Sequence, residues 1–290
     1  MKGIAFAPGH ISAFFEPVYC AQNMDRTGSC GAGMSVSLGA ISQVSVQPAS
    51  NQTVIVQING RQSPAAVTKS GVHYLLGDAC VRIAINTMID LPVSQGFGMS
   101  AAGVLSANLA LADLLNIPKE HAIRAAHYAE IQSHTGLGDV VASSFGGIEI
   151  RRKAGLPPWG MLEHIPGNYD MVLCVIGKKI ETKEILTDPN KVRKIASVGR
   201  YCTKKLLDKP SLEHLFALAW EFTRKIDIAD ATVLQAIEKA NVHGMASMCM
   251  LGNSVFAIGD TPMLSKVLSA YGTVFCCTVD VQGARILHEK

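Results

Sequence analysis

Short stretches of alternating apolar and polar residues mark the first half of the chain. The stretch SVSLGAISQVSVQ (35–47), for example, places most of its apolar side chains at every second position. A strand with one buried face has this period, because successive side chains point to opposite sides of a sheet. Alternation of this kind, together with short apolar runs in the second half, predicts strands at 3–7, 34–47, 53–58, 147–151, 170–176, 254–258 and 273–279.

Longer stretches with apolar residues three or four positions apart predict helices. These are 71–89, 100–115, 118–132, 190–207, 211–226, 230–240, a short piece at 245–251, and 262–270. Strands cluster early and helices late in the first half, without a regular strand–helix alternation. This order favours a two-domain α+β fold over a doubly wound parallel sheet. The proline- and glycine-rich stretch 154–168 is the best boundary, so the expected domains are 1–155 and 156–290.

Composition narrows the classes of partner. The chain has 290 residues, which is long enough for one large domain or two ordinary ones. Of these residues 48% are hydrophobic and 17% charged, so a generous buried core is available. The net charge is only +3, and the densest basic run is Arg151–Lys153. A nucleic-acid partner is therefore not expected, whereas small anionic ligands are compatible with this charge.

Cysteine usage and hydropathy indicate a cytoplasmic protein. The eight cysteines are scattered without a Cys-x-x-Cys pair, and apolar neighbours predict that they are buried, reduced thiols. The N-terminus lacks an apolar stretch long enough for a signal peptide. The most membrane-like stretch, 97–115, contains Asn108 and Asp113, so we interpret it as a buried helix and expect no membrane partner.

Glycine and serine crowd the start of the helix predicted at 100–115. The stretch LPVSQGFGMSAAG (91–103) forms a glycine-rich turn in front of an alanine-rich helix. Unpaired N–H groups at a helix N-terminus bind phosphate, and glycine lets the backbone approach the anion. The patterns G-x-x-x-x-G-K-[ST] and G-x-G-x-x-G are both absent. A turn that merely leads into a tightly packed helix explains this stretch equally well.

A second polar cluster follows in HYAEIQSHTGLGDVVASSFGG (127–147). On a helix, His127, Glu130 and His134 share one face, and Asp139 follows in a glycine-rich turn. One interpretation is a metal-dependent hydrolase that binds zinc through this face. Another makes Glu130 a magnesium ligand and Asp139 a general base. A capped helix end with solvated polar residues is the third.

Three stretches together resemble the GHMP kinases, the family of galactokinase, homoserine kinase, mevalonate kinase and phosphomevalonate kinase. PVSQGFGMSAA (92–102) matches P-x-x-x-G-[LF]-G-x-S-[SA]-A, APGHISAFFEP (7–17) is similar to the first family motif, and GLGDVVASSFGG (136–147) resembles the stretch around the family's aspartate. The resemblance implies an N-terminal domain like domain 2 of ribosomal protein S5 and a C-terminal ferredoxin-like domain.

The resemblance also implies roles for individual residues. Ser100 and Glu130 would hold Mg²⁺, and Asp139 would take the proton from the substrate hydroxyl; these three form the expected catalytic set. ATP would be the phosphate donor and a homodimer the expected assembly. The residues expected to bind the ATP phosphates are Gly96, Phe97, Gly98, Met99, Ser100 and Ala101.

The sequence departs from the broader family at one residue and in one longer segment. His10 stands where mevalonate kinase has a lysine and galactokinase an arginine. The glycine run of the third family motif is replaced by VHGMASMCMLGNSVFA (242–257), which keeps only Gly244 and Gly252. A narrower resemblance, to one archaeal branch of the family, comes from PGHISAFFEPV, GSCGAG, SSFGGIEIRRKAG and ASMCMLGNSVFAIG.

That branch acts on a small acid with one carboxylate and two hydroxyls, which requires a fixed cation and hydrogen-bond donors. The expected substrate-binding residues are Ser29, His127, Arg151 and His10. Arginine suits the carboxylate because its planar fork binds at two points. Strand alternation places Arg151 and Glu149 on one face and Arg152 on the other. Shikimate, mevalonate and homoserine are the alternative substrates, and a non-catalytic nucleotide-binding protein is a further alternative.

Overall fold

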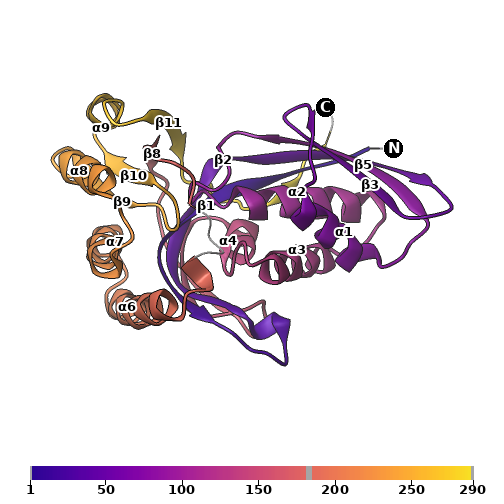
Figure 1. Cartoon of the computed structure of the whole chain (residues 1–290), viewed down its shortest axis with the longest axis horizontal. Coiled ribbons are helices and arrows are strands. Elements are labelled where there is room, and N and C mark those ends of the chain that lie inside the picture. The colour runs from indigo at the N-terminus through magenta and orange to yellow at the C-terminus, as the bar shows by residue number, and fades with distance from the viewer. Residues whose placement is uncertain (1, 181–184, 289–290) are drawn as a thin grey trace.

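The computed structural model describes residues 2–180 and 185–288, and its strands form two separate sheets (Figure 1). The larger sheet has eight strands in the order β12-β1-β2-β5-β3-β4, with β6 pairing β2 and β7 pairing β6. Helices α1 to α4 lie on one side of it (Figure 1), with α2 and α4 against the strands and α1 and α3 packed on α2. The bounds are β1 Lys2–Val18, β2 Gly28–Pro48, β3 Thr53–Ile58, β4 Arg61–Gln62, α1 Ala66–Leu76, β5 Val81–Ile89, α2 Met99–Leu114, α3 Lys119–Ser133, α4 Asp139–Phe145, β6 Ile148–Lys153, β7 Met161–Ile165 and β12 Arg285–Ile286.

The smaller sheet has four antiparallel strands in the order β11-β8-β10-β9. Along the chain the elements run strand, helices, two strands, helix, strand, which is the ferredoxin-like arrangement. Both sheets therefore agree with the α+β class that the sequence predicts. The bounds are β8 Asp170–Val175, α6 Pro189–Asp208, α7 Leu212–Ile226, α8 Ala231–Ala240, β9 Gly244–Met248, β10 Ser254–Gly259, α9 Thr261–Leu268 and β11 Thr273–Thr278.

The two long strands β1 and β2 connect the halves of the molecule. They curve out of the larger sheet towards α6 and α7 (Figure 1), and β1 shifts register after Pro8 and again after Ser12. At its far end, Phe14 and Phe15 both contact the ring of Phe222 on α7. The register shifts allow one strand to serve two cores, because a bulge bends a strand and increases its twist.

The alanine-rich sequence of α2 reflects its close packing on β1. A side chain on Gly3 of β1 would overlap the carbonyl oxygen of Ala110 on α2. Ala101, Ala102 and Ala107 are fully buried on the same helix. Small residues therefore let the backbones of α2 and β1 approach one another, and this fixes the N-terminus of α2 against the sheet.

Several predicted elements are wrong. Segment 71–89 is not one helix: α1 ends at Leu76, and β5 begins at Val81. Alternate residues of β5 are buried, but its apolar run is too short to separate strand from helix by pattern alone. Segment 245–251 is not helical for the same reason, since β9 pairs with β10. Strand β7 lies inside the predicted boundary 154–168 and was not expected.

The sheets divide the chain differently from the predicted boundary at residue 155. Strand β7 pairs with β6, and β12 pairs with β1, so residues from both sides of this boundary build the larger sheet. The division into domains at 155 thus remains a prediction, whereas the sheet itself extends to Ile165 and recruits the C-terminal segment.

The cysteines are less uniformly buried than expected. All eight lie within the described residues, and all are free thiols. Cys174, Cys202 and Cys249 are buried as predicted, whereas Cys80 and Cys276 are exposed, because they lie in a turn and on the edge strand of the smaller sheet. Within residues 2–180 and 185–288, no helix is long and apolar enough to cross a bilayer.

Candidate active site

A cleft of about 240 Å³ opens where the two halves of the molecule meet. Its walls come from β1, from the start of β2, from the turn before α2, from the end of α3 and from the turn before α4. The segment carrying Leu186 and the loop carrying Met250 and Leu251 close the remaining side. All six residues predicted to bind phosphates line this cleft, together with Ser29, Glu130 and Asp139.

The glycine-rich turn brings the N-terminus of α2 to the cleft. The backbones of Gly96 and Gly98 have φ of 77° and 62°, values that favour glycine. Gly98 caps the helix, and a side chain there would come within 3.1 Å of the His10 backbone. The first-turn N–H groups of α2 have no partner within the helix. They leave a concentrated positive dipole facing the cleft, which suits a phosphate group.

Ser100 and Glu130 meet beside this turn. The Ser100 hydroxyl donates to Oε1 of Glu130 over 2.5 Å, and Glu130 is only 2% exposed. Its second oxygen, Oε2, is buried without a hydrogen-bond partner. Burial raises the pKa of Glu130 to about 7, although the Ser100 hydrogen bond opposes this. A hydroxyl and a carboxylate with an unused oxygen are the hard donors that Mg²⁺ prefers, so the two residues fit that ion.

The raised pKa makes Glu130 a source of instability in the metal-free protein. When the pKa of a carboxyl group is higher in the folded than in the unfolded protein, the folded protein loses stability as pH rises between the two values, here from 4.5 to about 7. We expect the free energy of unfolding of Glu130→Gln to exceed that of the wild type by about 1–3 kcal/mol at about pH 8, with the difference closing near pH 5. The variant should therefore unfold at a higher temperature at pH 8. Thermal unfolding without metal across pH measures this. A gap of equal size at both pH values contradicts it.

Asp139 is the first residue of α4, and its side chain is 23% exposed to the cleft. Its Oδ1 accepts a hydrogen bond from Nδ1 of His10 over 2.6 Å. Gly136 lies between the two carboxylates: a side chain there would overlap Oε2 of Glu130 and come within 2.9 Å of Oδ2 of Asp139. The turn before α4 therefore brings two carboxylates into one cleft: the buried one of Glu130, which fits a metal ion, and the half-buried one of Asp139, which His10 holds.

Arg151 lies beneath the cleft. It is 2% exposed and is not among the residues that line the cleft. Its Nη2 donates to the Ser12 hydroxyl over 3.2 Å, and Ser12 lines the cleft. A side chain on Gly138 would overlap the Ser29 hydroxyl and come within 2.9 Å of Nε of Arg151. Arg152 is exposed and pairs with Glu163, which confirms the predicted faces.

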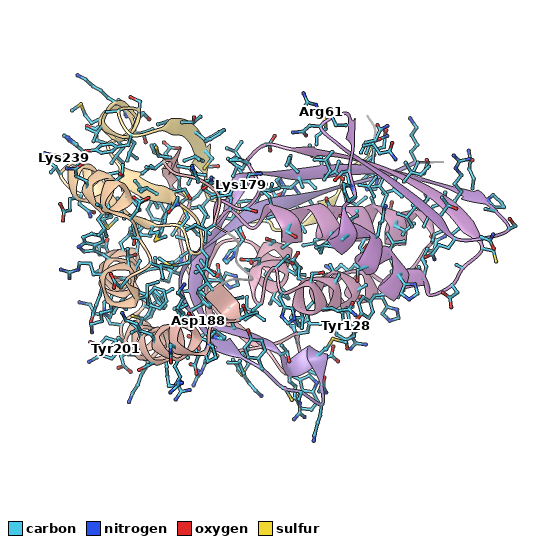
Figure 2. The ribbon with its side chains drawn as sticks, viewed as in Figure 1. Arg61, Tyr128, Lys179, Asp188, Tyr201 and Lys239 are labelled. Atoms are coloured by element: carbon cyan, nitrogen blue, oxygen red, sulfur yellow. The ribbon has the colours of Figure 1, made fainter. Side chains whose placement is uncertain are left out.

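His127 requires a correction, because it does not line the cleft. The side chain is buried, and its Nε2 lies 3.0 Å from the Thr27 carbonyl oxygen and 3.2 Å from that of Met24. The neighbouring Tyr128, labelled in Figure 2, donates to Asp25 in the same hairpin. Burial lowers the pKa of His127, so a neutral ring holds the β1–β2 hairpin, and His127 supports Ser29 only indirectly.

The hydrolase interpretation is also not supported by the geometry. His134 follows the end of α3 in a left-handed conformation, so it leaves the face that carries Glu130. In the part of the chain that the structure describes, no three His, Cys, Asp or Glu residues are placed to hold one metal ion. The helical face predicted from spacing therefore ends one residue too early.

Other features of the site were missed from sequence. Ser12 and Phe15 line the cleft from β1, and Leu186 and Met250 line it from the C-terminal half. His10 was expected to bind substrate, but it is fully buried behind Asp139. Nε2 of His10 contacts Glu149. From sequence, only the strand face of Glu149 was predicted, and not this partner. The motif GSCGAG was the available signal, because its Gly33 lies beside this contact.

Known proteins resemble the chain across most of its length. The model of the GHMP kinases N terminal domain matches residues 66–147. The chain is 33% identical over 275 residues to the pantoate kinase of Methanocaldococcus jannaschii, covering 94% of this chain and 99% of that protein. A solved phosphotransferase related to the CoA biosynthesis pathway superposes with a TM-score of 0.89 at 27% identity, covering 99% and 98% of the two chains. The homoserine kinase of Cytophaga hutchinsonii reaches 0.70 at 17% identity, covering 99% and 97%, and shows the fold alone.

Proposed function

The chain belongs to the GHMP kinases and is an ATP-dependent kinase of a small molecule, and we propose that its substrate is (R)-pantoate. The reaction converts ATP and pantoate to ADP and 4-phosphopantoate on the archaeal route to coenzyme A. The observation that carries the proposal is that the α2 N-terminus, the Ser100–Glu130 pair and Asp139 share one cleft. The likeness to a curated pantoate kinase over nearly the whole chain supports this choice of substrate.

The placement of these residues supports a mechanism. The first turn of α2 would bind the ATP phosphates, and Ser100 and Glu130 would hold Mg²⁺. When bound, Mg²⁺ neutralises the charge that develops on the transferred phosphoryl group. Asp139 accepts the proton of the pantoate hydroxyl while that oxygen bonds to the γ-phosphorus and the bond to ADP breaks. Positioning and charge neutralisation supply most of the acceleration in phosphoryl transfer.

The rest of the cleft suits the rest of pantoate. Ser12 and Ser29 offer hydroxyls for the carboxylate and the second hydroxyl, with Arg151 as the cation behind them. Phe15 and Leu186 give an apolar wall, which matches the two methyl groups of pantoate. Burial of each such carbon contributes about 0.8 kcal/mol.

Three further points belong to the proposal. We assign the enzyme to the cytoplasm, because its eight cysteines are free thiols. The metal is Mg²⁺, from the donor set of Ser100 and Glu130. The assembly is a homodimer, as in related kinases.

A substrate panel tests the proposal. The protein is incubated with Mg-ATP and pantoate, shikimate, mevalonate, homoserine or a pantoate analogue without its two methyl groups, and ADP release is measured. We expect kcat/KM to be highest for pantoate and about tenfold lower for the analogue, from the loss of two buried methyl groups. Turnover of another compound in preference to pantoate contradicts the proposal.

Removing the buried cation tests the proposed acid subsite. We expect Arg151→Ala to raise KM for pantoate by roughly 10- to 100-fold, because the cation behind the carboxylate and its charge-assisted hydrogen bond to Ser12 are lost, while KM for ATP changes little. Arg152→Ala on the opposite face is the matched control and leaves both constants unchanged. A large effect in Arg152→Ala instead places the acid subsite on the other side of β6. If Arg151→Ala does not fold, KM for pantoate is measured instead in Arg151→Lys, which keeps the positive charge.

A further inference from the structure

A chain of four charged side chains runs from the cleft into the interior. Asp139 accepts from Nδ1 of His10, and Nε2 of His10 lies 2.9 Å from Oε1 of Glu149. The same oxygen of Glu149 accepts from Nη1 of Arg151. His10 and Glu149 are fully buried, and Arg151 is 2% exposed. Opposite charges alternate along this row of four side chains, so the row is neutral only if His10 is a cation.

We propose that Glu149 is a positioning residue that keeps His10 doubly protonated, and that the His10 imidazolium in turn holds the Asp139 carboxylate in place. The inference deepens the proposed function, since it rests on Asp139 as the group that accepts the substrate proton. Neither Glu149 nor its contact with His10 touches the cleft directly. Glu149 therefore acts on Asp139 only through His10.

The sheet is built to allow this contact. His10 is on β1 and Glu149 on β6, and strand β2 lies between them. Gly33 of β2 pairs with Glu149, and a side chain at Gly33 would come within 2.6 Å of Nε2 of His10 and 3.0 Å of Oε1 of Glu149. Because position 33 is glycine, the two side chains meet across the middle strand.

Both ring nitrogens of His10 face carboxylates, and this determines its protonation. A carboxylate oxygen only accepts, so a nitrogen at 2.6 or 2.9 Å from one must carry a hydrogen. A neutral ring could instead accept at Nε2 from Nη1 of Arg151, but that distance is longer, 3.3 Å. It would also leave the Nε2 lone pair facing Glu149 at the shorter distance.

The groups around His10 agree with a cation. The charged groups that face it are Asp139 from α4 and Glu149 and Arg151 from β6, while β2 and the turn before α2 present glycine and backbone. Burial by itself lowers the pKa of His10, but the charge of Glu149 and hydrogen bonds to both carboxylates outweigh it and raise the pKa. Removing the Glu149 charge should therefore let His10 lose its proton at a lower pH.

Glu149→Gln tests this, because it keeps the shape and removes the charge. The matched control is Glu163→Gln on the neighbouring strand β7, where the side chain is partly exposed and pairs with Arg152. We expect the alkaline limb of kcat to move down by about one pH unit or more in Glu149→Gln, with KM for ATP unchanged. The control superimposes on the wild type. A change in KM for pantoate with no shift of the pH profile overturns the proposal, because Glu149 would then serve only Arg151.

Nitrogen-15 NMR of the wild-type imidazoles gives a readout that needs no turnover, with the His10 signals assigned from their loss in His10→Gln. Both ring nitrogens of His10 should carry hydrogen at about pH 7.5, well above the ordinary pKa of histidine, about 6.5. A neutral His10 at that pH overturns the proposal even if Glu149→Gln does not fold. If pantoate is not turned over and His10 is nevertheless a cation, the proposed substrate fails and the positioning role of Glu149 stands.

Discussion

Asp139→Asn is expected to lower kcat for phosphorylation by about 100- to 10,000-fold, the usual range for loss of a general base. The amide keeps the size of the carboxylate but cannot accept the substrate proton. It still offers an oxygen to Nδ1 of His10, so the 2.6 Å contact can persist with little rearrangement. KM for ATP should change little, because the proposed site for the phosphates is the N-terminus of α2. Steady-state ADP release with saturating pantoate measures the effect.

Asp113→Asn is the matched control, since Asp113 lies near the end of α2 and is exposed. This variant should keep wild-type kcat. A kcat for Asp139→Asn within tenfold of the wild type would remove Asp139 from the role of base. Thermal unfolding of both variants separates that result from a loss of folded protein.

The parts of the site that lie close together in sequence could be predicted from sequence. The glycine-rich turn before α2 is continuous, and Glu130 and Asp139 lie within one stretch of 21 residues, 127–147. All of these residues reach the cleft. His127 belongs to the same stretch and is nevertheless wrong as a donor to the cleft, because carbonyl groups of the β1–β2 hairpin already occupy its ring nitrogen. Spacing places a residue on a helix face, but it does not show what packs against that face.

The parts that depend on strand pairing could not be predicted in this way. The contact between His10 and Glu149 joins residues 139 positions apart, and it exists only because β1, β2 and β6 are neighbours and position 33 is glycine. The difference at His10 from the lysine or arginine of related kinases becomes understandable in this arrangement. A buried histidine between two carboxylates can carry the positive charge that the sequence left unassigned. Strand β5 was missed for a related reason, since its short apolar run takes its conformation from the strands on either side.

Gly136→Ala is expected to lower kcat/KM for pantoate by at least about 100-fold, because displacing a reacting group by about 1 Å has an effect of that size. The added methyl would overlap Oε2 of Glu130 and come within 2.9 Å of Oδ2 of Asp139, so the two carboxylates could not both keep their positions. Gly103→Ala on α2 is the control: its methyl meets nothing within 4 Å, and alanine in a helix is favoured over glycine by about 1 kcal/mol. The control should therefore keep full activity and unfold at the same or a higher temperature. Equal activity in the two variants would mean that the turn before α4 shifts to accommodate the methyl group. The reaction would then not depend on the separation of Glu130 from Asp139.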